Sequence, residues 1–308
     1  MSNITFAKLK KNAGLEKLAK AVQAGGSRGF EKDARYWEPT VDKVGNGFAV
    51  IRFLDAPAVD GDNATPWVTI FNHGFKGPGG QWYIENSLTT LGQPDPVSDM
   101  NQKLWNTGDK ANQELVRDRK RKLNYISNIL VVNDPAHPEN NGKVFLYKYG
   151  KKIHDKILDK AGLLGESQEG ETFRDPEDIV YNPMSLFEGG NFKLSIRKVD
   201  GFRNYDKSTF DLKPSPLFDG DDEKIEKLWK SEYSLKAEIA PDKFKSYDEL
   251  KRKLERVLGI ADTTPRASSV ELPSHSELEV ATKPTSTKKS KPASDPDDEF
   301  ADFASLAE

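Results

Sequence analysis

The segment ISNILVVNDPAHPENNGKVFLYKY (residues 126–149) decides how this chain is expected to fold. Two runs of β-branched and aromatic residues, 126–132 and 143–149, flank a stretch of Asn, Asp, Pro and Gly, which predicts two strands joined by a turn. Similar runs are FAVIRFL (48–54), WVTIFNH (67–73), QWYIE (81–85) and NFKLSIRKV (191–199). Because helices do not alternate regularly with these strands, the pattern favours a small β-barrel over a parallel sheet.

Helices are predicted beside the strands. Residues 150–162 place their apolar residues on one side of a helix. Residues 221–258 are helical again, and there Ser246 with Glu249 has the spacing of a capping box, followed by Gly259 as a helix stop. Strands and helices that do not alternate indicate the α+β class.

Composition narrows the class of protein. The 308 residues provide ample length for a buried core, and a net charge of −3 indicates no particular partner by itself. The absence of cysteine excludes disulfides and thiolate metal sites. No signal-peptide core and no run of about 18 apolar residues is present, so we expect a soluble, non-secreted protein.

Catalytic motifs are absent from the sequence. It contains no phosphate-binding loop, no dinucleotide fingerprint, no HExxH and no GxSxG, and its four histidines are scattered. We therefore predict a protein that is not an enzyme, with a metal-dependent nuclease as a distant alternative.

Positive charge is concentrated between Lys103 and Lys160, where thirteen cations stand against seven acids. Five of the cations fall within residues 117–122 and run directly into a predicted strand. Such a concentration predicts contacts with the phosphates of a polyanion. The predicted phosphate-binding residues are Arg117, Arg119, Lys120, Arg121, Lys122, Lys148, Lys151, Lys152 and Arg203.

Aromatic residues lie among these cations and indicate the kind of polyanion. Base faces are already stacked in a duplex, whereas in a single strand each base can stack on a ring for about 1–3 kcal/mol. Tyr147 and Tyr149 share one strand face on either side of Lys148, although core packing is the alternative interpretation for any single ring. The predicted base-stacking residues are Trp105, Tyr125, Tyr147, Tyr149, Phe202 and Tyr205.

The composition also divides the chain into segments. Residues 1–24 form a predicted basic arm, with Lys8, Lys10 and Lys11 among its cations, and residues 25–260 form the core. Residues 261–294 have the Ser, Thr, Pro and Lys content of a disordered linker. Residues 295–308 form an acidic tail, in which Asp297, Asp298, Phe300 and Phe303 are the predicted partner-docking residues.

Six segments of the chain resemble one known family. They are GNGFAVIRFL (45–54), NHGF (72–75), QWYIE (81–85), NILVVNDPAHPENNGKVFLYKYGKKIHDKI (128–157), EGGNFKLSIRKVDGFRNYD (188–206) and DKFKSYDEL (242–250). In this order they resemble the single-stranded DNA-binding proteins of T-even-type tailed phages, which are also called helix-destabilising proteins. The resemblance covers nearly the whole chain.

The resemblance implies a core that contains an OB-fold β-barrel, here expected with added helical and β-ribbon lobes, a flexible basic N-terminal arm and a disordered acidic C-terminal tail. It implies a cleft that binds single-stranded DNA without sequence preference. Tyr125, Tyr147, Phe202 and Tyr205 match aromatic positions of that cleft, and Trp105 lies near another. In the family the arm contacts the next monomer on DNA, which implies cooperative binding. Lys10 and Lys11 match the basic motif of this arm, whereas Asn12 and Ala13 replace its hydroxyl residues.

The family's metal site is the clearest departure. Members that resemble this chain hold a structural zinc ion with one histidine and three cysteines. His73 matches the histidine, whereas Ser87, Val97 and Met100 stand at the cysteine positions and do not suit Zn²⁺. We therefore expect no cofactor and no metal. The residues expected to hold this lobe together by packing instead are Trp82, Tyr83 and Leu104.

Together these observations predict a protein that coats single-stranded DNA cooperatively during phage DNA replication, recombination and repair. Its expected location is the cytoplasm of the infected bacterial host. Its expected partners are single-stranded DNA, further copies of itself, and replication and recombination proteins. No contact with a membrane is expected. Two alternatives stay open: a single-stranded RNA-binding translational regulator, because nothing here obviously reads a 2′-hydroxyl, and a protein-interaction scaffold that acts through the tail.

Overall fold

The structure is a computed structural model that describes residues 33–164, 179–199 and 201–260. The predicted arm, linker and tail lie outside these residues. The described chain forms two compact units. The barrel unit contains the described residues up to Thr69 together with Asn124–Glu238. The helical unit contains Ile70–Leu123 and the described residues from Ile239 onward, so the predicted core of residues 25–260 consists of two parts.

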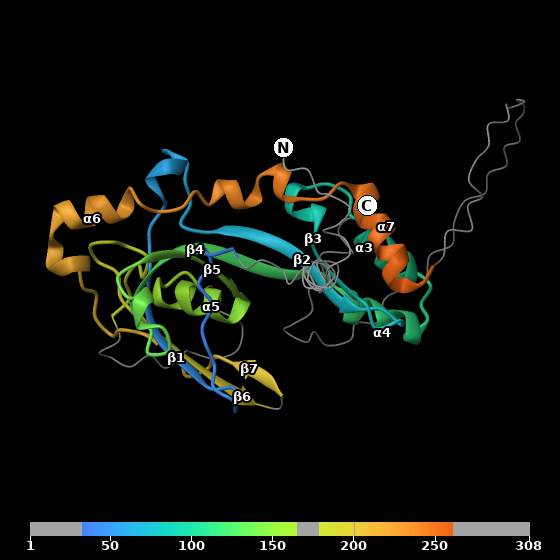
Figure 1. Ribbon diagram of the computed structural model, residues 1–308, viewed down its shortest axis with the longest axis horizontal. Helices are drawn as coiled ribbons and strands as arrows, with labels where there is room; N and C mark the ends of the chain where they lie inside the picture. The colour runs from blue at the N-terminus through green and yellow to red at the C-terminus, as the bar shows by residue number, and fades with distance from the viewer. Residues whose placement is uncertain (1–32, 165–178, 200, 261–308) are drawn as a thin grey trace, which may run out of the picture. The chain divides into compact units, whose positions relative to one another are not determined.

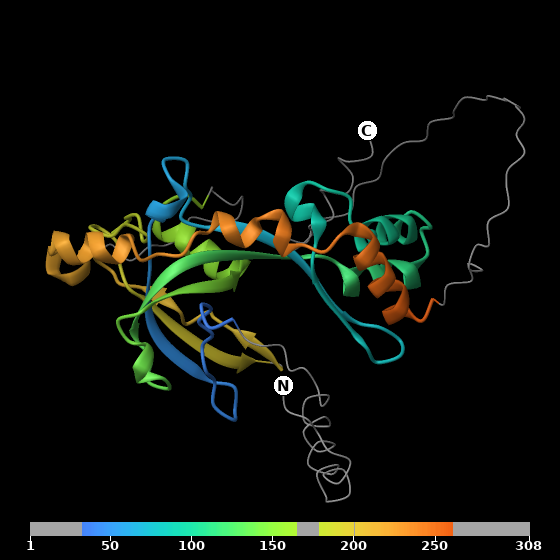
Figure 2. The same ribbon diagram turned by 45° about the horizontal axis from the view of Figure 1, so that its top comes forward.

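The barrel unit is built on antiparallel strands. Strand β1 (Gly47–Phe53) pairs with β4 (Lys122–Asn133) on one side and with β6 (Phe192–Val199) on the other. Strand β5 (Val144–Gly150) extends the sheet beyond β4. Two short strands pair with β6, namely β7 (Phe202–Asn204) and β8 (Thr209–Phe210). Figures 1 and 2 show this sheet curled into a half-barrel, which confirms the expected mixture of helices with a barrel-like sheet.

The interior of the barrel unit is largely aromatic. Phe53 is fully buried, and its ring centroid lies 5.3 Å from that of Tyr149, 5.8 Å from that of Phe192 and 6.2 Å from that of Phe210. Edge and tilted contacts of this kind are favourable beyond the burial of area. β-strands project alternate side chains to opposite faces, so the rings of β5 and β8 converge on β1.

Two helices cover parts of this unit. Helix α5 (Lys151–Lys160) follows β5 without a loop and buries Ile153 and Ile157, as the predicted helical stripe requires. Helix α6 (Asp222–Trp229) follows the 3₁₀ turn η4 (Leu217–Gly220). The buried cluster beneath α6 contains Leu54, Leu130, Leu186, Leu217, Ile225 and Leu228. A cluster of six large apolar side chains stabilises the placement of α6 by several kcal/mol.

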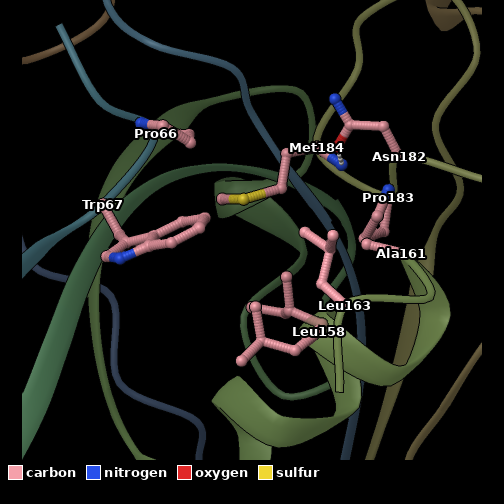
Figure 3. A pocket seen from close by; sticks show the side chains of 9 residues that line it. Pro66, Trp67, Leu158, Ala161, Leu163, Asn182, Pro183 and Met184 are labelled. Carbon is pink, nitrogen blue, oxygen red and sulfur yellow. Dashed lines mark hydrogen bonds between the residues drawn. The ribbon is translucent and has the colours of Figure 1, made fainter. Parts of the chain in front are cut away.

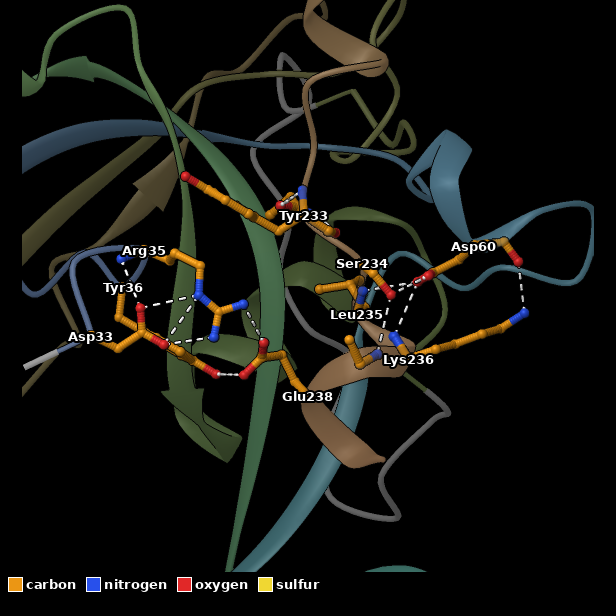
Figure 4. Close-up of polar contacts among 11 residues, drawn as sticks. Asp33, Arg35, Tyr36, Asp60, Tyr233, Ser234, Leu235, Lys236 and Glu238 are labelled. Carbon is orange, nitrogen blue, oxygen red and sulfur yellow. Dashed lines mark hydrogen bonds and ion pairs between the residues drawn. The ribbon is translucent and has the colours of Figure 1, made fainter. Parts of the chain in front are cut away.

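Carboxylates fasten the segment that leaves the barrel unit. Glu238, in the 3₁₀ helix η5 (Lys236–Ile239), accepts hydrogen bonds from Tyr36 Oη at 2.6 Å and from Arg35 Nη1 at 2.8 Å. Asp60, at the end of η1 (Ala58–Asp60), accepts the backbone N–H groups of Leu235 and Lys236 at 2.8 and 3.0 Å. Burial and the bond to Glu238 raise the pKa of Tyr36. Figure 4 shows both sets of contacts, which fix residues 234–238 in this unit.

The helical unit consists of a β-hairpin and three helices. Strand β2 (Val68–Lys76) enters it and pairs antiparallel with β3 (Trp82–Asn86). After the 3₁₀ helix η2 (Leu88–Leu91) come α3 (Pro96–Trp105) and α4 (Lys110–Arg119); α7 (Tyr247–Leu258) closes the unit after η6 (Pro241–Lys243). The remaining 3₁₀ turn of the described chain, η3 (Pro138–Asn140), lies between β4 and β5. The sequence did not predict α3 and α4.

Helix α7 matches its predicted signals. The Ser246 side chain accepts the N–H of Glu249 while the Glu249 carboxylate accepts the N–H of Ser246, and Gly259 ends the helix in the left-handed region at φ 67°. Gly77 lies against this end of the helix: a Cβ there would lie 2.0 Å from the carbonyl oxygen of Val257. The hairpin turn therefore requires glycine in order to contact α7.

Packing in the helical unit confirms one of the three expected residues and corrects another. Tyr83 is fully buried and stacks on Phe75 with ring centroids 5.1 Å apart. The same cluster contains Val97, Leu254 and Val257. Leu104 is half-buried, whereas Trp82 is 58% exposed. The expectation for Trp82 was wrong because neighbours on a strand point to opposite faces, and Tyr83 takes the buried one.

Candidate nucleic-acid interface

The cation run spans the end of α4 and the start of β4. Asp109 caps the N-terminus of α4 by accepting the N–H groups of Ala111 and Asn112. Arg117 and Arg119 occupy the last turn of α4, where cations complement the helix dipole. Lys120 is the C-cap, and β4 begins at Lys122. The run thus stands on regular structure, as the sequence predicted, but half of it belongs to a helix that the sequence did not predict.

Every second residue of the run lies over an aromatic ring. The guanidinium of Arg121 is 4.3 Å from the centroid of Phe71, and that of Arg119 is 5.7 Å from the centroid of Phe75. Arg117 lies 5.7 Å from the centroid of Trp105. A cation over a ring face gains about 0.5–1 kcal/mol at an exposed site, and the contact restricts a long side chain. The three rings therefore orient three arginines.

Arg119 is held more firmly than its neighbours. Its carbonyl oxygen accepts hydrogen bonds from His73 Nδ1 at 3.0 Å and from Asn101 Nδ2 at 3.4 Å. Its side chain is half-buried, and desolvation lowers its pKa. Arg117 and Lys122 are exposed. The two ends of the run are therefore open to solvent, and the contacts of Arg119 hold its middle in place.

The expected zinc position holds a polar contact of another kind. His73 is 1% exposed, and its Nε2 lies 3.3 Å from Asp95 Oδ1. Asp95 also accepts the N–H groups of Leu88, Val97 and Ser98. Burial would raise the pKa of Asp95, but the contact with His73 and these N–H groups outweigh it and hold the pKa below its ordinary value.

These residues do not fit a zinc ion. Ser87 is buried at the N-cap of η2, Val97 lies in the apolar cluster with Tyr83, and Met100 packs against that cluster. Within the described ranges, no three His, Cys, Asp or Glu side chains are placed so that they could share a metal ion. The donor set offers one imidazole and a carboxylate that already receives several hydrogen bonds.

The remaining predicted cations lie in the barrel unit. Lys148 is exposed on β5, although the protein that surrounds it lowers its pKa by desolvation. Lys151 and Lys152 are exposed in the first turn of α5, and Lys151 Nζ lies 2.8 Å from Asp155 Oδ2. No side chain caps this helix at Gly150. A helix N-terminus with two lysines is favourable for an anion such as a phosphate. Arg203 is exposed on β7.

Three of the predicted stacking rings lie in the core. Tyr147 and Tyr149 are each 3% exposed and Tyr125 is 9% exposed. Tyr125 stacks on His154 with centroids 3.6 Å apart, and Tyr149 Oη lies 2.9 Å from Ser127 Oγ. Burial raises the pKa of Tyr147 and of Tyr149. Stacking on a base requires an open ring face, which this arrangement does not provide at Tyr147 or Tyr149.

The other predicted rings are open to solvent. Phe202 is 78% exposed on β7, while Tyr205 and Trp105 are half-exposed. Trp105 carries Arg117 over its ring, so a base there meets a guanidinium as well. Sequence reasoning missed Phe71 and Phe75, since nothing in the sequence links residues on β2 to arginines near residue 120. It also missed Trp82 as an exposed ring.

An apolar pocket of about 340 Å³ lies elsewhere in the barrel unit. Figure 3 shows Trp67, Leu158, Leu163 and Met184 around it, and Asn182 contributes the polar side chain. The residues that line it include no lysine or arginine. Its chemistry therefore differs from that of the cationic positions.

Comparison with known proteins gives a consistent result. The family described as gp32 DNA binding protein like matches residues 45–258. The single-stranded DNA-binding protein of Enterobacteria phage T4 is 42% identical over 258 residues, which cover 82% of this chain and 80% of that protein. The protein of the same name from Enterobacteria phage T2 is 43% identical over 247 residues, or 78% and 76% of the two chains. In the part of the chain that the structure describes, no helix is long and apolar enough to cross a membrane.

Proposed function

Because this chain belongs to the family of gp32-like DNA-binding proteins, we propose that it binds single-stranded DNA and coats it during phage DNA replication, recombination and repair. The observation that carries the proposal is the similarity to proteins named for single-stranded DNA binding over about four fifths of their length. This function is a binding function and not an enzymatic one, in agreement with the sequence prediction. Binding single strands lowers their free energy relative to the duplex, so the protein destabilises helices without a chemical step.

Phosphates are bound in this proposal by two groups of cations. One group is the run from Arg117 to Lys122 in the helical unit. The other is the junction of β5 and α5, where Lys148, Lys151 and Lys152 stand beside an uncapped helix N-terminus. Arg203 on β7 adds a further cation. Phosphate contacts are independent of sequence, which accounts for binding without sequence preference.

Bases stack on the open rings in this proposal. Phe202 is the strongest candidate because most of its surface is exposed, and Tyr205 and Trp105 follow. Tyr125 lies at the margin of the core and contributes once its contact with His154 loosens. Tyr147 and Tyr149 then support the sheet from within. Stacking tolerates every base, since each base has a π-face.

The finer features of the proposal concern the whole chain. The curled antiparallel sheet supports an OB-fold, whose strands commonly bind oligonucleotides. The basic segment with Lys8, Lys10 and Lys11 contacts a neighbouring copy and makes binding cooperative.

The acidic tail recruits replication and recombination proteins through Asp297, Asp298, Phe300 and Phe303. The protein acts in the cytoplasm of the infected host and needs no zinc in this proposal, which is supported by Ser87, Val97 and Met100, residue types that do not suit Zn²⁺.

A salt-dependent titration of the full chain with homopolymeric dT tests the function. The affinity is expected to fall as salt rises, because each phosphate contact releases counterions, with a slope of about −0.7 per contact on a logarithmic plot. A matched RNA oligonucleotide and a duplex serve as the competing ligands. Equal or tighter binding of either one at physiological salt contradicts the assignment to single-stranded DNA.

A further inference from the structure

A pocket of about 540 Å³ lies in the barrel unit between the start of β5 and helix α6. It contains none of the residues that the sequence predicted to bind DNA. Three lysines and three aromatic residues line it, and we call it the lysine–aromatic pocket. These residues are Lys143, Lys224, Lys227, Phe145, Phe218 and Tyr233.

The charge of this pocket has one sign. Its lining includes no carboxylate. Lys143 and Lys227 are exposed, and neither forms an ion pair with a residue that the structure describes. Lys224 contacts Asp221, with Nζ and Oδ2 2.8 Å apart, which raises the pKa of Lys224. Among the described residues, these two lysines therefore have no carboxylate partner that would compete with an anion from outside.

The backbone beside the pocket is in an unusual conformation. Phe218 has φ 48° and Asp219 has φ 55°, both in the left-handed region. Each such residue costs about 1–2 kcal/mol in a chain of L-amino acids, and strain of this kind gathers at functional sites. Leu217 is buried beneath α6, whereas Phe218 is 38% exposed. The strained turn therefore coincides with a ring that lines the pocket.

We propose that the lysine–aromatic pocket binds a nucleotide of single-stranded DNA. A base stacks on Phe218, and Lys143 and Lys227 bind the phosphates on either side. The volume falls within the range of about 300–1,000 Å³ for small-molecule sites. A ring bordered by lysines is the combination that single strands recognise, whereas a duplex offers no free base face. This inference rests on the proposed function and adds a contact point in the barrel unit.

Two variants of the full chain test the pocket by different readouts. The double variant Lys143→Ala/Lys227→Ala is expected to bind long dT several-fold more weakly, with a salt slope that is smaller by about 1.4 for two lost contacts. Phe218→Asn removes the ring while Asn tolerates the left-handed region better than Phe, so its thermal stability is expected to stay equal or rise. Its affinity is expected to fall about five-fold or more with no change of slope.

The matched control is Lys230→Ala, which removes a lysine of the same region that is paired with Glu226 and does not line the pocket. Arg121→Ala is measured in parallel. If wild-type protein binds dT and Arg121→Ala weakens it while both pocket variants bind like wild type, the pocket proposal is overturned and the proposed function stands. If wild-type protein does not bind dT, the function itself fails. The pocket variants are also tested for binding of a separate peptide of residues 295–308. If they bind dT normally but no longer bind this peptide, the pocket is a peptide site, which also overturns the proposal.

Discussion

At the residue scale, the charge that contacts DNA and the ring that orients this charge belong to different residues. Arg121 supplies charge, and Phe71 contributes only a ring face 4.3 Å from the guanidinium. A ring that orients a cation acts on affinity without changing the number of counterions released. The two contributions can therefore be measured separately in one titration.

Phe71→Leu is expected to lower the affinity for dT by about two- to five-fold with an unchanged salt slope, since the cation–π contact is worth about 0.5–1 kcal/mol. Arg121→Ala is expected to lower both the affinity and the slope, the latter by about 0.7. Fluorescence titrations at four salt concentrations give both quantities. The double variant should resemble Arg121→Ala alone, because the ring has no other role in binding. A slope that changes equally in both single variants contradicts this division of roles.

Glu232 is a buried acid whose titration affects folding. Its side chain is buried, neither carboxylate oxygen has a hydrogen-bond partner among the described residues, and burial together with Asp55 raises its pKa to about 9. The folded chain therefore keeps a proton that the unfolded chain releases. Between the ordinary value of 4.5 and about 9, stability falls as the pH rises.

Glu232→Gln is expected to stabilise the protein at pH 8 by about 2 kcal/mol, because the amide needs no proton to stay neutral. The gain should shrink steadily toward pH 5, where wild-type Glu232 is protonated in the folded state and partly protonated in the unfolded state. Urea unfolding at several pH values provides the measurement. Glu226→Gln is the matched control, since Glu226 is exposed on α6. A gain that is independent of pH contradicts the assignment.

At the element scale, Asp95 joins three elements of the helical unit. It caps α3, accepts the N–H of Leu88 in η2 and contacts His73 of β2. Its pKa is held below the ordinary value, so its contribution to stability is fully present above the unfolded pKa. That contribution is lost as the pH falls through the folded pKa.

Asp95→Asn keeps the shape of the side chain and removes its charge. We expect a loss of about 1–3 kcal/mol at pH 7, because both carboxylate oxygens accept N–H groups and an amide NH₂ in place of one oxygen leaves a donor without its acceptor. The difference from wild type should narrow as the pH falls from the ordinary carboxyl pKa through the lower pKa of folded Asp95, where this carboxylate becomes protonated. Asp109→Asn, which changes the exposed cap of α4, is expected to cost less than half as much. Equal losses in the two variants contradict the central role of Asp95.

Three elements, β5, α4 and α7, show which structural features could be predicted from the sequence and which could not. Alternation on β5 predicted that Tyr147 and Tyr149 share a face, and they do, but period two does not say which face is buried. The answer depends on β1, whose Phe53 contacts both rings. Helix α4 lacks a strong apolar stripe, since Val116 is its one buried residue, and it was missed for that reason. The capping box of α7 is local and was predicted correctly.

At the scale of the whole molecule, opposite charges lie in separate parts of the chain. Residues 103–160 carry a net charge of +6, and residues 294–308 carry −6. The chain between residues 261 and 294, the predicted linker, is rich in Ser, Thr, Pro and Lys. A tethered acidic segment competes with DNA for cations at a high effective concentration.

Removal of residues 295–308 is therefore expected to tighten binding to dT by about ten-fold at low salt. The effect should largely disappear near 0.5 M salt, because screening weakens the attraction of the cations for the tail as well as for DNA. Two full-length variants separate charge from docking. The variant Asp297→Asn/Asp298→Asn/Asp302→Asn should reproduce much of the truncation, whereas Phe300→Ala/Phe303→Ala should leave the affinity for DNA unchanged and weaken capture of partner proteins. If the Phe variant also tightens DNA binding, the tail competes through apolar contacts, and the electrostatic account is wrong.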